Sequence, residues 1–396
     1  MKKIVFITWD GPQTSYMEGL FMPILSEVQK NADYSFHVIQ FTWGDKKRIA
    51  LTQEKAKQLN ITYTARPIYR KPIAFLGSII SAYLGIFFLK KYIVENKIDA
   101  IMPRSIMPAF MANRLHNCKV PIIFDADGLP LQERVDFSGL LTSSKQYQLL
   151  KKEEDTVLQN ATLVITRSEK AIDIHLNTIK TNSRDKFSVV FNGRDSEFFK
   201  PNENISNQTR SELNIANNTK VFVYCGSLGN QYGWDDMLVV FLDYLKINTN
   251  ATFLILTGNP DYALQRIPAD KQNKFIVKSV AFNEVPKYLS MANVAFAIRE
   301  PKPSMQGVAP IKLGEYLLMG IPTIASIGIG DTEQIVKNAP YCFLYDNLAP
   351  NRHTEAVNFI QNLNAIDSGK IRSFGIAYFS IEKSAESYLQ TFQKLK

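Results

Sequence analysis

Short apolar runs of strand length alternate with longer segments of helical periodicity along most of the chain. In the first half the predicted strands are Ile4–Trp9, Phe36–Phe41, Ile61–Ala65, Ala100–Met102, Ile122–Phe124, Leu163–Thr166 and Ser188–Phe191. The predicted helices between them are Tyr16–Gln29, Lys46–Leu59, Ala109–Leu115 and Tyr147–Leu158. Apolar strands separated by helices are typical of a parallel sheet with helices on both faces. The first half therefore predicts a doubly wound α/β domain.

The same alternation continues after residue 220. Its predicted strands are Val221–Cys225, Thr252–Leu256, Phe275–Val277, Val294–Ile298, Thr323–Ala325 and Tyr341–Leu344, and its helices are Asp235–Lys246, Asp261–Ile267, Val285–Met291, Ile311–Met319 and Thr332–Lys337. The polar stretch Asn202–Asn218 is interpreted as a linker. The 396 residues are enough for two domains. We predict domains of residues 1–200 and 201–378, followed by a last helix within 379–396.

The segment between Arg299 and Ser326 contains a lysine that is unusual for an ordinary helix. A helix is predicted from Pro310, and Lys312 lies in its first turn, where the helix dipole disfavours a cation. An anion bound at the open backbone N–H groups would reverse that effect. Glu315 lies one turn further on roughly the same face. The pair indicates a nucleotide site, with an exposed Lys and a solvated Glu as the alternative interpretation.

This segment resembles the donor-site segment of family-4 retaining glycosyltransferases, which have the GT-B fold. The resemblance rests on Pro-Ile-Lys-Leu-Gly-Glu-Tyr-Leu-Leu-Met-Gly-Ile-Pro-Thr-Ile-Ala (310–325), and the stretches Val190–Pro201, Val223–Leu228 and Phe379–Tyr388 agree in order and spacing. It implies an α/β fold of two doubly wound, Rossmann-like domains, an acceptor-binding first domain, a nucleotide-sugar-binding second domain, a cleft between them, and a C-terminal helix that crosses back to the first.

The activity implied by the resemblance is retaining transfer of a sugar from a nucleotide-diphosphate sugar to a saccharide or lipid-linked acceptor. Relatives of this kind work in bacterial surface polysaccharide synthesis, and the resemblance implies neither a cofactor nor a metal. The implied donor-binding residues are Gly226, Ser227, Leu228, Arg194, Pro310, Ile311, Lys312 and Glu315. Lys312, Arg299 and Asp127 are the implied catalytic residues.

The chain departs from the family pattern in two places. Many relatives have Arg and Lys in the diphosphate loop where this chain has Ser227 and Tyr232, so the cations on the diphosphate must come from Arg194, Arg299, Lys312 or, as a weaker candidate, Lys302. The common pattern also has two Glu separated by seven residues. The later one matches Glu315, but Gly307 stands at the earlier position, and Glu300 is a possible substitute. Two alternatives stay open: a nucleotide-sugar 2-epimerase-like enzyme, and a non-catalytic nucleotide-sugar-binding partner subunit, which Gly307, Ser227 and Tyr232 motivate.

Residues that follow the strands of the first half are candidates for acceptor binding. They are Gly11, Thr14, Ser15, Arg104 and Asp125. Asp127 stands where many relatives have His, and it either orients the acceptor or the transferred sugar or simply forms a turn before Gly128. Asp125 and Asp127 together could bind a divalent metal, but the GT-B pattern does not use that motif. The loop at Gly11 either offers backbone N–H groups to a saccharide or phosphate, or holds only a helix N-cap at Thr14 or Ser15.

The net charge of +9 favours anionic partners: nucleotide phosphates, a lipid phosphate or an anionic membrane. Nucleic acid is not expected, because basic tracts with interleaved aromatic residues are lacking. Cys118, Cys225 and Cys342 are far apart in apolar contexts and predict reduced thiols of a cytoplasmic protein. Asp10 interrupts the first apolar run too early for a signal peptide.

The run 72–91 is uncharged up to its last two residues and of about membrane-spanning length. A span would split the first sheet, so a buried helix is favoured. The alternative is a surface helix on anionic lipid at the inner face of the plasma membrane. Basic residues that flank the run would then contact the lipid: Arg66, Arg70, Lys71, Lys90 and Lys91.

Overall fold

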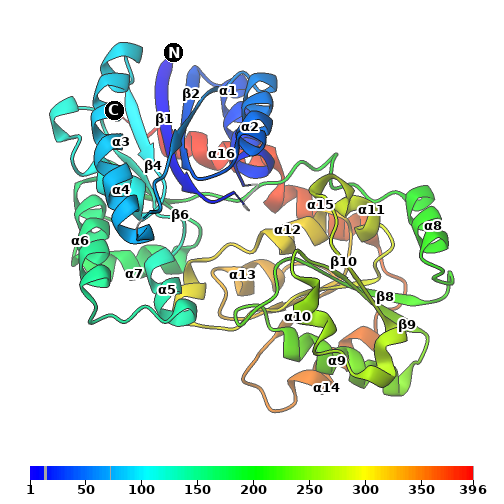
Figure 1. The fold of residues 1–396 in the computed structure, drawn as a ribbon. Helices are drawn as coiled ribbons and strands as arrows, with labels where there is room; N and C mark the ends of the chain where they lie inside the picture. Colours follow the sequence, from blue (N-terminus) through cyan, green and yellow to red (C-terminus); the bar gives the residue numbers. More distant parts are fainter. Residues whose placement is uncertain (13–15, 72, 396) are drawn as a thin grey trace. The chain divides into compact units, whose positions relative to one another are not determined.

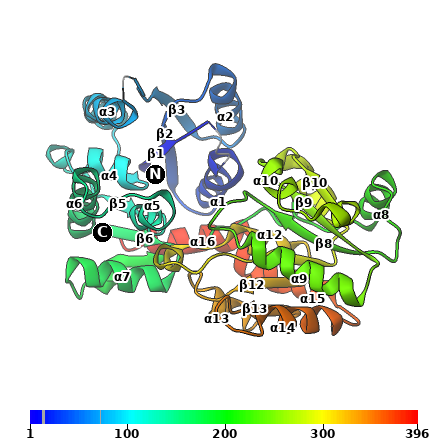
Figure 2. The ribbon, with the colours of Figure 1, turned by 60° about the horizontal axis from the view of Figure 1, so that its bottom comes forward.

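The computed structural model describes residues 1–12, 16–71 and 73–395, so Thr14 and Ser15 lie outside the described residues. The chain forms two compact units (Figures 1 and 2). The first unit contains Met1–Asn192 together with the C-terminal segment from Ser384, and the second contains Gly193–Lys383.

The first unit is built on parallel strands. They are β1 (Lys2–Asp10), β2 (Tyr34–Thr42), β3 (Thr62–Pro67), β4 (Ala100–Pro103), β5 (Ile123–Asp125), β6 (Leu163–Thr166) and β7 (Phe187–Val189). The sheets β3-β2-β1-β4 and β5-β6-β7 are joined by the bridges Ile101–Ile122 and Arg104–Asp125. The helices are α1 (Met22–Asn31, after a π-helical turn Met17–Phe21), α2 (Lys46–Gln58), α3 (Ala74–Asn96), α4 (Ile106–Ala112), α5 (Pro130–Ser138), α6 (Lys145–Asn160) and α7 (Glu169–Ile179).

The second unit repeats this topology. Its strands are β8 (Lys220–Cys225), β9 (Ala251–Leu256), β10 (Phe275–Lys278), β11 (Val294–Ala297), β12 (Thr323–Ser326) and β13 (Cys342–Tyr345), in the order β10-β9-β8-β11-β12-β13. Its helices are α8 (Glu203–Glu212), α9 (Trp234–Ile247), α10 (Pro260–Leu264), α11 (Val285–Leu289), α12 (Ile311–Leu318), α13 (Thr332–Val336), α14 (Arg352–Gln361) and α15 (Ser368–Phe379). In both units the strand order reverses beside the first strand, which is where Rossmann-like sheets bind ligands.

The doubly wound prediction is confirmed for both units, but the linker prediction is wrong. Residues 203–212 form α8, with Asn202 as its N-cap and with Thr209 and Arg210 buried. Arg210 donates hydrogen bonds to the carbonyls of Ala216, Thr219 and Met291. The polar sequence therefore reflects a helix with one large exposed face. The structure divides the chain after residue 192, whereas the sequence analysis placed the boundary at residue 200.

Helix α12 packs closely on α15 because each of the two helices has a glycine where it meets the other. A Cβ atom on Gly314 would lie 2.8 Å from the Phe379 ring, and one on Gly375 would lie 2.7 Å from the Leu317 backbone. Pro310 is the N-cap of α12 and not its first helical residue. Beyond its C-terminus Gly320 has a φ of +69°, a conformation that favours glycine. These contacts fix the position of the helix that carries Lys312 and Glu315.

The last helix, α16 (Ile381–Phe392), joins the first unit from Ser384 onward, in keeping with the predicted fold class. Phe392 packs against the rings of Tyr34 and Phe36, and Ser387 accepts a hydrogen bond from the backbone N–H of Phe191. The C-terminal segment thereby completes the core of the first unit.

Candidate functional site

The loop after β8 lies where the strand order of the second unit reverses. It contains the predicted diphosphate residues Gly226, Ser227 and Leu228. Asn259, which the sequence analysis missed, accepts a hydrogen bond from the backbone N–H of Leu228 at 3.1 Å and donates one to its carbonyl at 2.9 Å. The Tyr224 hydroxyl donates to the carbonyl of Ser227 at 2.5 Å. Side chains on both sides therefore fix the conformation of this loop.

Glu315 lies between two cations beside this loop. Its Oε1 is 2.9 Å from Nε of Arg194, and its Oε2 is 2.8 Å from Nζ of Lys312. The Glu315 side chain is fully buried and that of Arg194 is 7% exposed, whereas that of Lys312 is 33% exposed. The structure thus brings together three predicted donor-binding residues. The interpretation of Glu315 as a solvated surface residue is wrong, because α15 and the core cover its side of α12.

Arg194 reaches this cluster from far away in the sequence. Its backbone N–H donates to the carbonyl of Phe379 at 2.7 Å, and its carbonyl accepts from the N–H of Ile381 at 3.1 Å. This pairing places Arg194 between α15 and α16, beside α12. Its guanidinium also lies 5.5 Å from the centre of the Phe282 ring. The position of Arg194 is therefore set by backbone pairing and not by its own long side chain.

The cluster retains a positive charge. Burial alone would raise the pKa of Glu315, but Lys312 and Arg194 outweigh burial and lower it, so the carboxylate is ionised near neutral pH. Burial would lower the pKa of Lys312, but Cys225 and Glu315 raise it. Two cations share one carboxylate at the N-terminus of α12, so the site is suited to an anion.

Arg299 lies on the other side of the end of β8. Its guanidinium is 5.0 Å from the centre of the Tyr232 ring and interacts with Tyr224, whereas Lys312 interacts with Cys225. Tyr224 and Cys225 are consecutive strand residues, so their side chains point to opposite faces of the sheet. The predicted cations Arg299 and Lys312 therefore flank the diphosphate loop from two faces.

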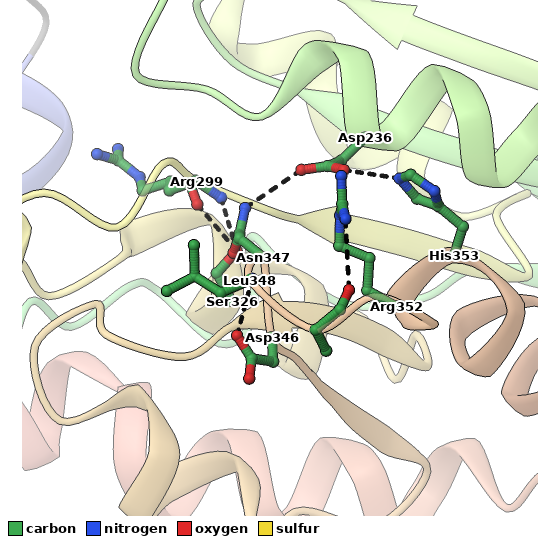
Figure 3. A network of polar contacts seen from close by, with 9 residues as sticks. Asp236, Arg299, Ser326, Asp346, Asn347, Leu348, Arg352 and His353 are labelled. Atoms are coloured by element: carbon green, nitrogen blue, oxygen red, sulfur yellow. Dashed lines mark hydrogen bonds and ion pairs between the residues drawn. The ribbon is translucent and has the colours of Figure 1, made fainter.

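A polar network next to the loop ties α9 to α14 (Figure 3). Asp236 accepts hydrogen bonds from Nε of Arg352 at 3.0 Å and from Asn347 at 3.3 Å, and it lies 2.7 Å from Nε2 of His353. Burial would raise the pKa of Asp236, but Arg352 and His353 lower it. The Arg299 side chain points away from this network, while its backbone pairs with Ser326. The sequence analysis assigned none of the Asp236 partners.

Gly307 stands where the family pattern has its first Glu, and Glu300 is the candidate substitute for that carboxylate. Gly307 is buried at the end of a short 3₁₀ helix, Pro303–Gly307. Glu300 follows Arg299 and is partly buried. Burial and the nearby carboxylates of Asp236 and Asp235 raise its pKa. The positive charge of Lys302 acts to lower the pKa of Glu300. Glu300 therefore lies on the α9 side of the loop, and its role as a substitute stays a prediction.

The described acceptor candidates, Gly11, Arg104 and Asp125, lie at the carboxyl ends of β1, β4 and β5 in the first unit. Arg104, after β4, lies 2.6 Å from Oδ2 of Asp127 and 3.7 Å from Oδ1 of Asp10. Asp125 is fully buried and pairs at 2.7 Å with Arg167, which the sequence analysis missed. Asp127 has a φ of +54° and precedes Gly128, so it forms the expected turn and also presents its carboxylate.

The two arginine–carboxylate pairs concern the alternative that Asp125 and Asp127 bind a divalent metal ion. An oxygen of each carboxylate, Asp125 and Asp127, is already bound to an arginine, and a cation there would compete with both guanidinium groups. Gly11 follows β1 next to this cluster, and Trp43 packs so closely that a Cβ on Gly11 would lie 2.8 Å from its ring. In the described ranges no group of three His, Cys, Asp or Glu residues could hold a metal ion.

Neither a protein-family model nor a curated protein matches the chain, but solved structures match it along its whole length. HepE from Anabaena, in complex with UDP and glucose, has a TM-score of 0.74 at 15% identity over 100% of both chains. A glycosyltransferase from Rickettsia africae has 0.72 at 14% identity over 100% of both chains. Sucrose-phosphate synthase from Thermosynechococcus elongatus has 0.70 at 16%, covering 100% of this chain and 99% of the other.

A protein from Listeria monocytogenes named for UDP-N-acetylglucosamine 2-epimerase is a more distant match, with a TM-score of 0.57 at 12% identity over 98% and 95% of the two chains. At such identities the likeness shows the fold. The chain has the GT-B fold of two Rossmann-like domains, which confirms the fold class expected from the sequence.

Proposed function

We propose that this protein is a glycosyltransferase that moves a sugar, with retention of configuration, from a nucleotide-diphosphate sugar to a saccharide or lipid-linked acceptor. The observation that carries the proposal is the pair of cations, Arg194 and Lys312, held by buried Glu315 at the N-terminus of α12. HepE, with the same fold, was solved with UDP and with UDP-glucose.

The diphosphate binds in this proposal against Lys312, Arg194 and the open N–H groups of α12, with Arg299 on the other side of the loop. Negative charge grows on the diphosphate as the bond to the sugar breaks, so cations fixed in advance stabilise the transition state more than the substrate. No step in this mechanism requires a metal ion or a cofactor.

Glu315 is an anchor of the two cations in this proposal. The ribose contact implied by the family resemblance would require part of the cluster to move, because the Glu315 side chain is fully buried and each oxygen already accepts a hydrogen bond. Anchoring of the cations and contact with the ribose use the same carboxylate. Only the ribose contact makes the enzyme discriminate against a donor without the 2′-hydroxyl.

The acceptor is proposed to bind at Asp127, Arg104 and Asp10 in the first unit. This cluster contains carboxylate acceptors beside a guanidinium donor, and the Asp127 side chain is 29% exposed. A mixed set of donors and acceptors suits the hydroxyl groups of a saccharide. Anionic groups of an acceptor would meet carboxylates here, so its phosphate, if present, is expected elsewhere.

The experiment is a thermal-shift panel with UDP, GDP, CMP and dTDP sugars, followed by product analysis with the stabilising donor. Transfer to an added saccharide or polyprenyl-phosphate-linked acceptor supports the proposal. Release of an epimer or free sugar from donor alone would instead support the epimerase-like alternative. Stabilisation by a donor without any turnover would identify a binding subunit.

A further inference from the structure

Helix α3 has an apolar face that no other described part of the first unit covers. Its exposed apolar side chains are Leu76 (50% exposed), Ile80 (52%), Tyr83 (48%), Leu84 (49%), Phe87 (70%) and Val94 (73%). We call these residues the α3 stripe. The helix has 23 residues and is long and apolar enough to cross a membrane, but a third of its most apolar window is buried against the unit. In Figure 2 it is seen almost end-on at the outside of the unit.

The stripe runs along one side of the helix. Residues 76, 80, 83, 87 and 94 follow the spacing of a single helical face. The opposite face packs inward, where a Cβ on Gly77 would lie 2.3 Å from the Tyr69 carbonyl oxygen and one on Gly85 would lie 2.6 Å from Met111. Because these close contacts admit only glycine, α3 cannot rotate to bury the stripe. The exposure is therefore built into the packing of the unit.

Cations lie on both sides of the stripe. On a helix with 3.6 residues per turn, Lys90 and Lys91 fall on its two opposite edges. Lys91 is 75% exposed and lies 3.5 Å from Glu95 in an exposed ion pair, which water screens. Arg70 and Lys71 precede the helix and are exposed, and the Arg70 guanidinium lies 4.5 Å from the centre of the Trp43 ring. Exposed aromatic rings next to cations are typical of the water–lipid boundary.

We propose that the α3 stripe docks on an anionic membrane surface. The helix would lie in the plane of the membrane, with the stripe among the acyl chains and the flanking cations at the lipid phosphates. A second copy of this chain carries the same net charge of +9 and the same cations beside its stripe, so charge disfavours it as the occupant. A transmembrane orientation would remove the buried face of α3 from the core of the unit.

The experiment is flotation of the full chain with vesicles of phosphatidylcholine alone or mixed with phosphatidylglycerol, at low and high salt. Ile80→Ser with Phe87→Ser should weaken binding to the anionic vesicles about tenfold or more. Lys90→Glu with Lys91→Glu should weaken it about thirtyfold or more, and high salt should weaken the wild type.

Matched controls change the same chemistry elsewhere. Leu141→Ser with Leu264→Ser removes apolar side chains that are 69% and 50% exposed. Lys246→Glu with Lys370→Glu makes the same change in net charge at lysines that are 76% and 73% exposed. Both controls should float like the wild type. Melting temperatures will show whether the variants are folded; the substituted side chains are exposed except that of Lys90, which is half-buried.

The fluorescence of Trp43 provides a readout that needs no change in the stripe. Brominated lipid chains should quench its emission in the anionic vesicles, and Trp43→Phe should remove that quenching. Absence of flotation, binding that is unchanged by the Lys90 and Lys91 reversal, or binding without Trp43 quenching would overturn the proposal. A dimer in solution that the Ile80 and Phe87 changes dissociate would show that a second copy covers the stripe, which would also overturn it.

Discussion

Replacement of Glu315 by Gln tests the site at its centre, because this carboxylate holds Arg194 and Lys312 together. Gln fills almost the same volume, so packing is preserved. It is neutral, however, and its amide donor group would face one of the two cations. Arg194 and Lys312 would then repel each other without a shared partner, at a place where Glu315 is fully buried and Arg194 only 7% exposed.

The expected loss of stability follows from burial. Removal of one partner from a buried ion pair costs about 3–5 kcal/mol. The Lys312 side chain is one-third exposed, so water screens its interaction with Glu315. A loss of about 3 kcal/mol in the free energy of unfolding of the second unit is therefore expected. For a domain of this size each kcal/mol lowers Tm by about 2–4 °C, which gives a decrease of about 6–12 °C. A nucleoside diphosphate brings negative charge to the two cations and should restore part of this loss.

The effect should depend on pH in a defined direction. The pKa of Glu315 is lowered in the folded protein from its usual value of 4.5. The carboxylate therefore stabilises the fold fully above about pH 4.5, and this contribution is lost as the pH falls through the lower, folded-state pKa. The difference in stability between wild type and Glu315→Gln should be constant near neutral pH and should shrink in acid.

The assay is thermal and urea unfolding of both proteins with and without UDP, over a range of pH. Glu212→Gln is the matched control, since Glu212 forms an ion pair with Lys287 that water screens, so its loss should lower stability far less. If Glu315→Gln were no less stable than Glu212→Gln, the anchoring role would be refuted. If only the wild type discriminated against 2′-deoxy donors, the ribose role would be supported in addition.

Three further predictions concern the rest of the chain. Lys312→Ala should lower kcat/KM by about tenfold to a hundredfold in a folded protein, because it removes a charge-assisted contact to the diphosphate. The control Lys302→Ala should change kcat/KM little. Equal kinetics for the two variants would show that Lys312 has no part in the mechanism. EDTA should leave turnover unchanged, and activity that disappears and returns with manganese would make Asp125 and Asp127 metal ligands. Burial lowers the pKa of His175 to about 4, from 6.5, so the protein should lose about 3 kcal/mol of unfolding free energy as the pH falls from about 6.5 to 4, and His175→Gln should lose much less over that range.

Much of the fold could be predicted because central strands such as β4, β6 and β12 are buried on both faces. Every strand predicted from an apolar run is present, with ends shifted by one or two residues. Helices were harder. Helix α8 is mostly exposed and rich in Asn and Ser, so its composition resembles that of a loop. Helix α15 contains Gly375, which packing on α12 requires but helix propensity disfavours.

The cluster proposed as the donor site could be predicted only where its residues are neighbours in the sequence. Lys312 and Glu315 are three residues apart on one helix, so their spacing shows that they can meet. Arg194 reaches them through backbone pairing with the segment around Ser380, which sequence spacing cannot show. The burial of Glu315 was also missed, because a carboxylate is seldom buried unless cations from elsewhere in the chain pair with it.

One departure from the family pattern in the predicted diphosphate loop, at Tyr232, has a physical explanation in the structure. Tyr232 stands where many relatives have Lys, and the Arg299 guanidinium lies over its ring at 5.0 Å. The aromatic face therefore supports a cation that a loop lysine would otherwise supply. The charge near the loop is retained, but it now comes from the end of β11. This substitution makes Tyr232 a positioning residue: Tyr232→Phe should preserve activity, because it keeps the ring, and Tyr232→Ala should lower activity as much as Arg299→Ala does. A Tyr232→Ala variant with unchanged kinetics would show that Arg299 does not depend on the ring.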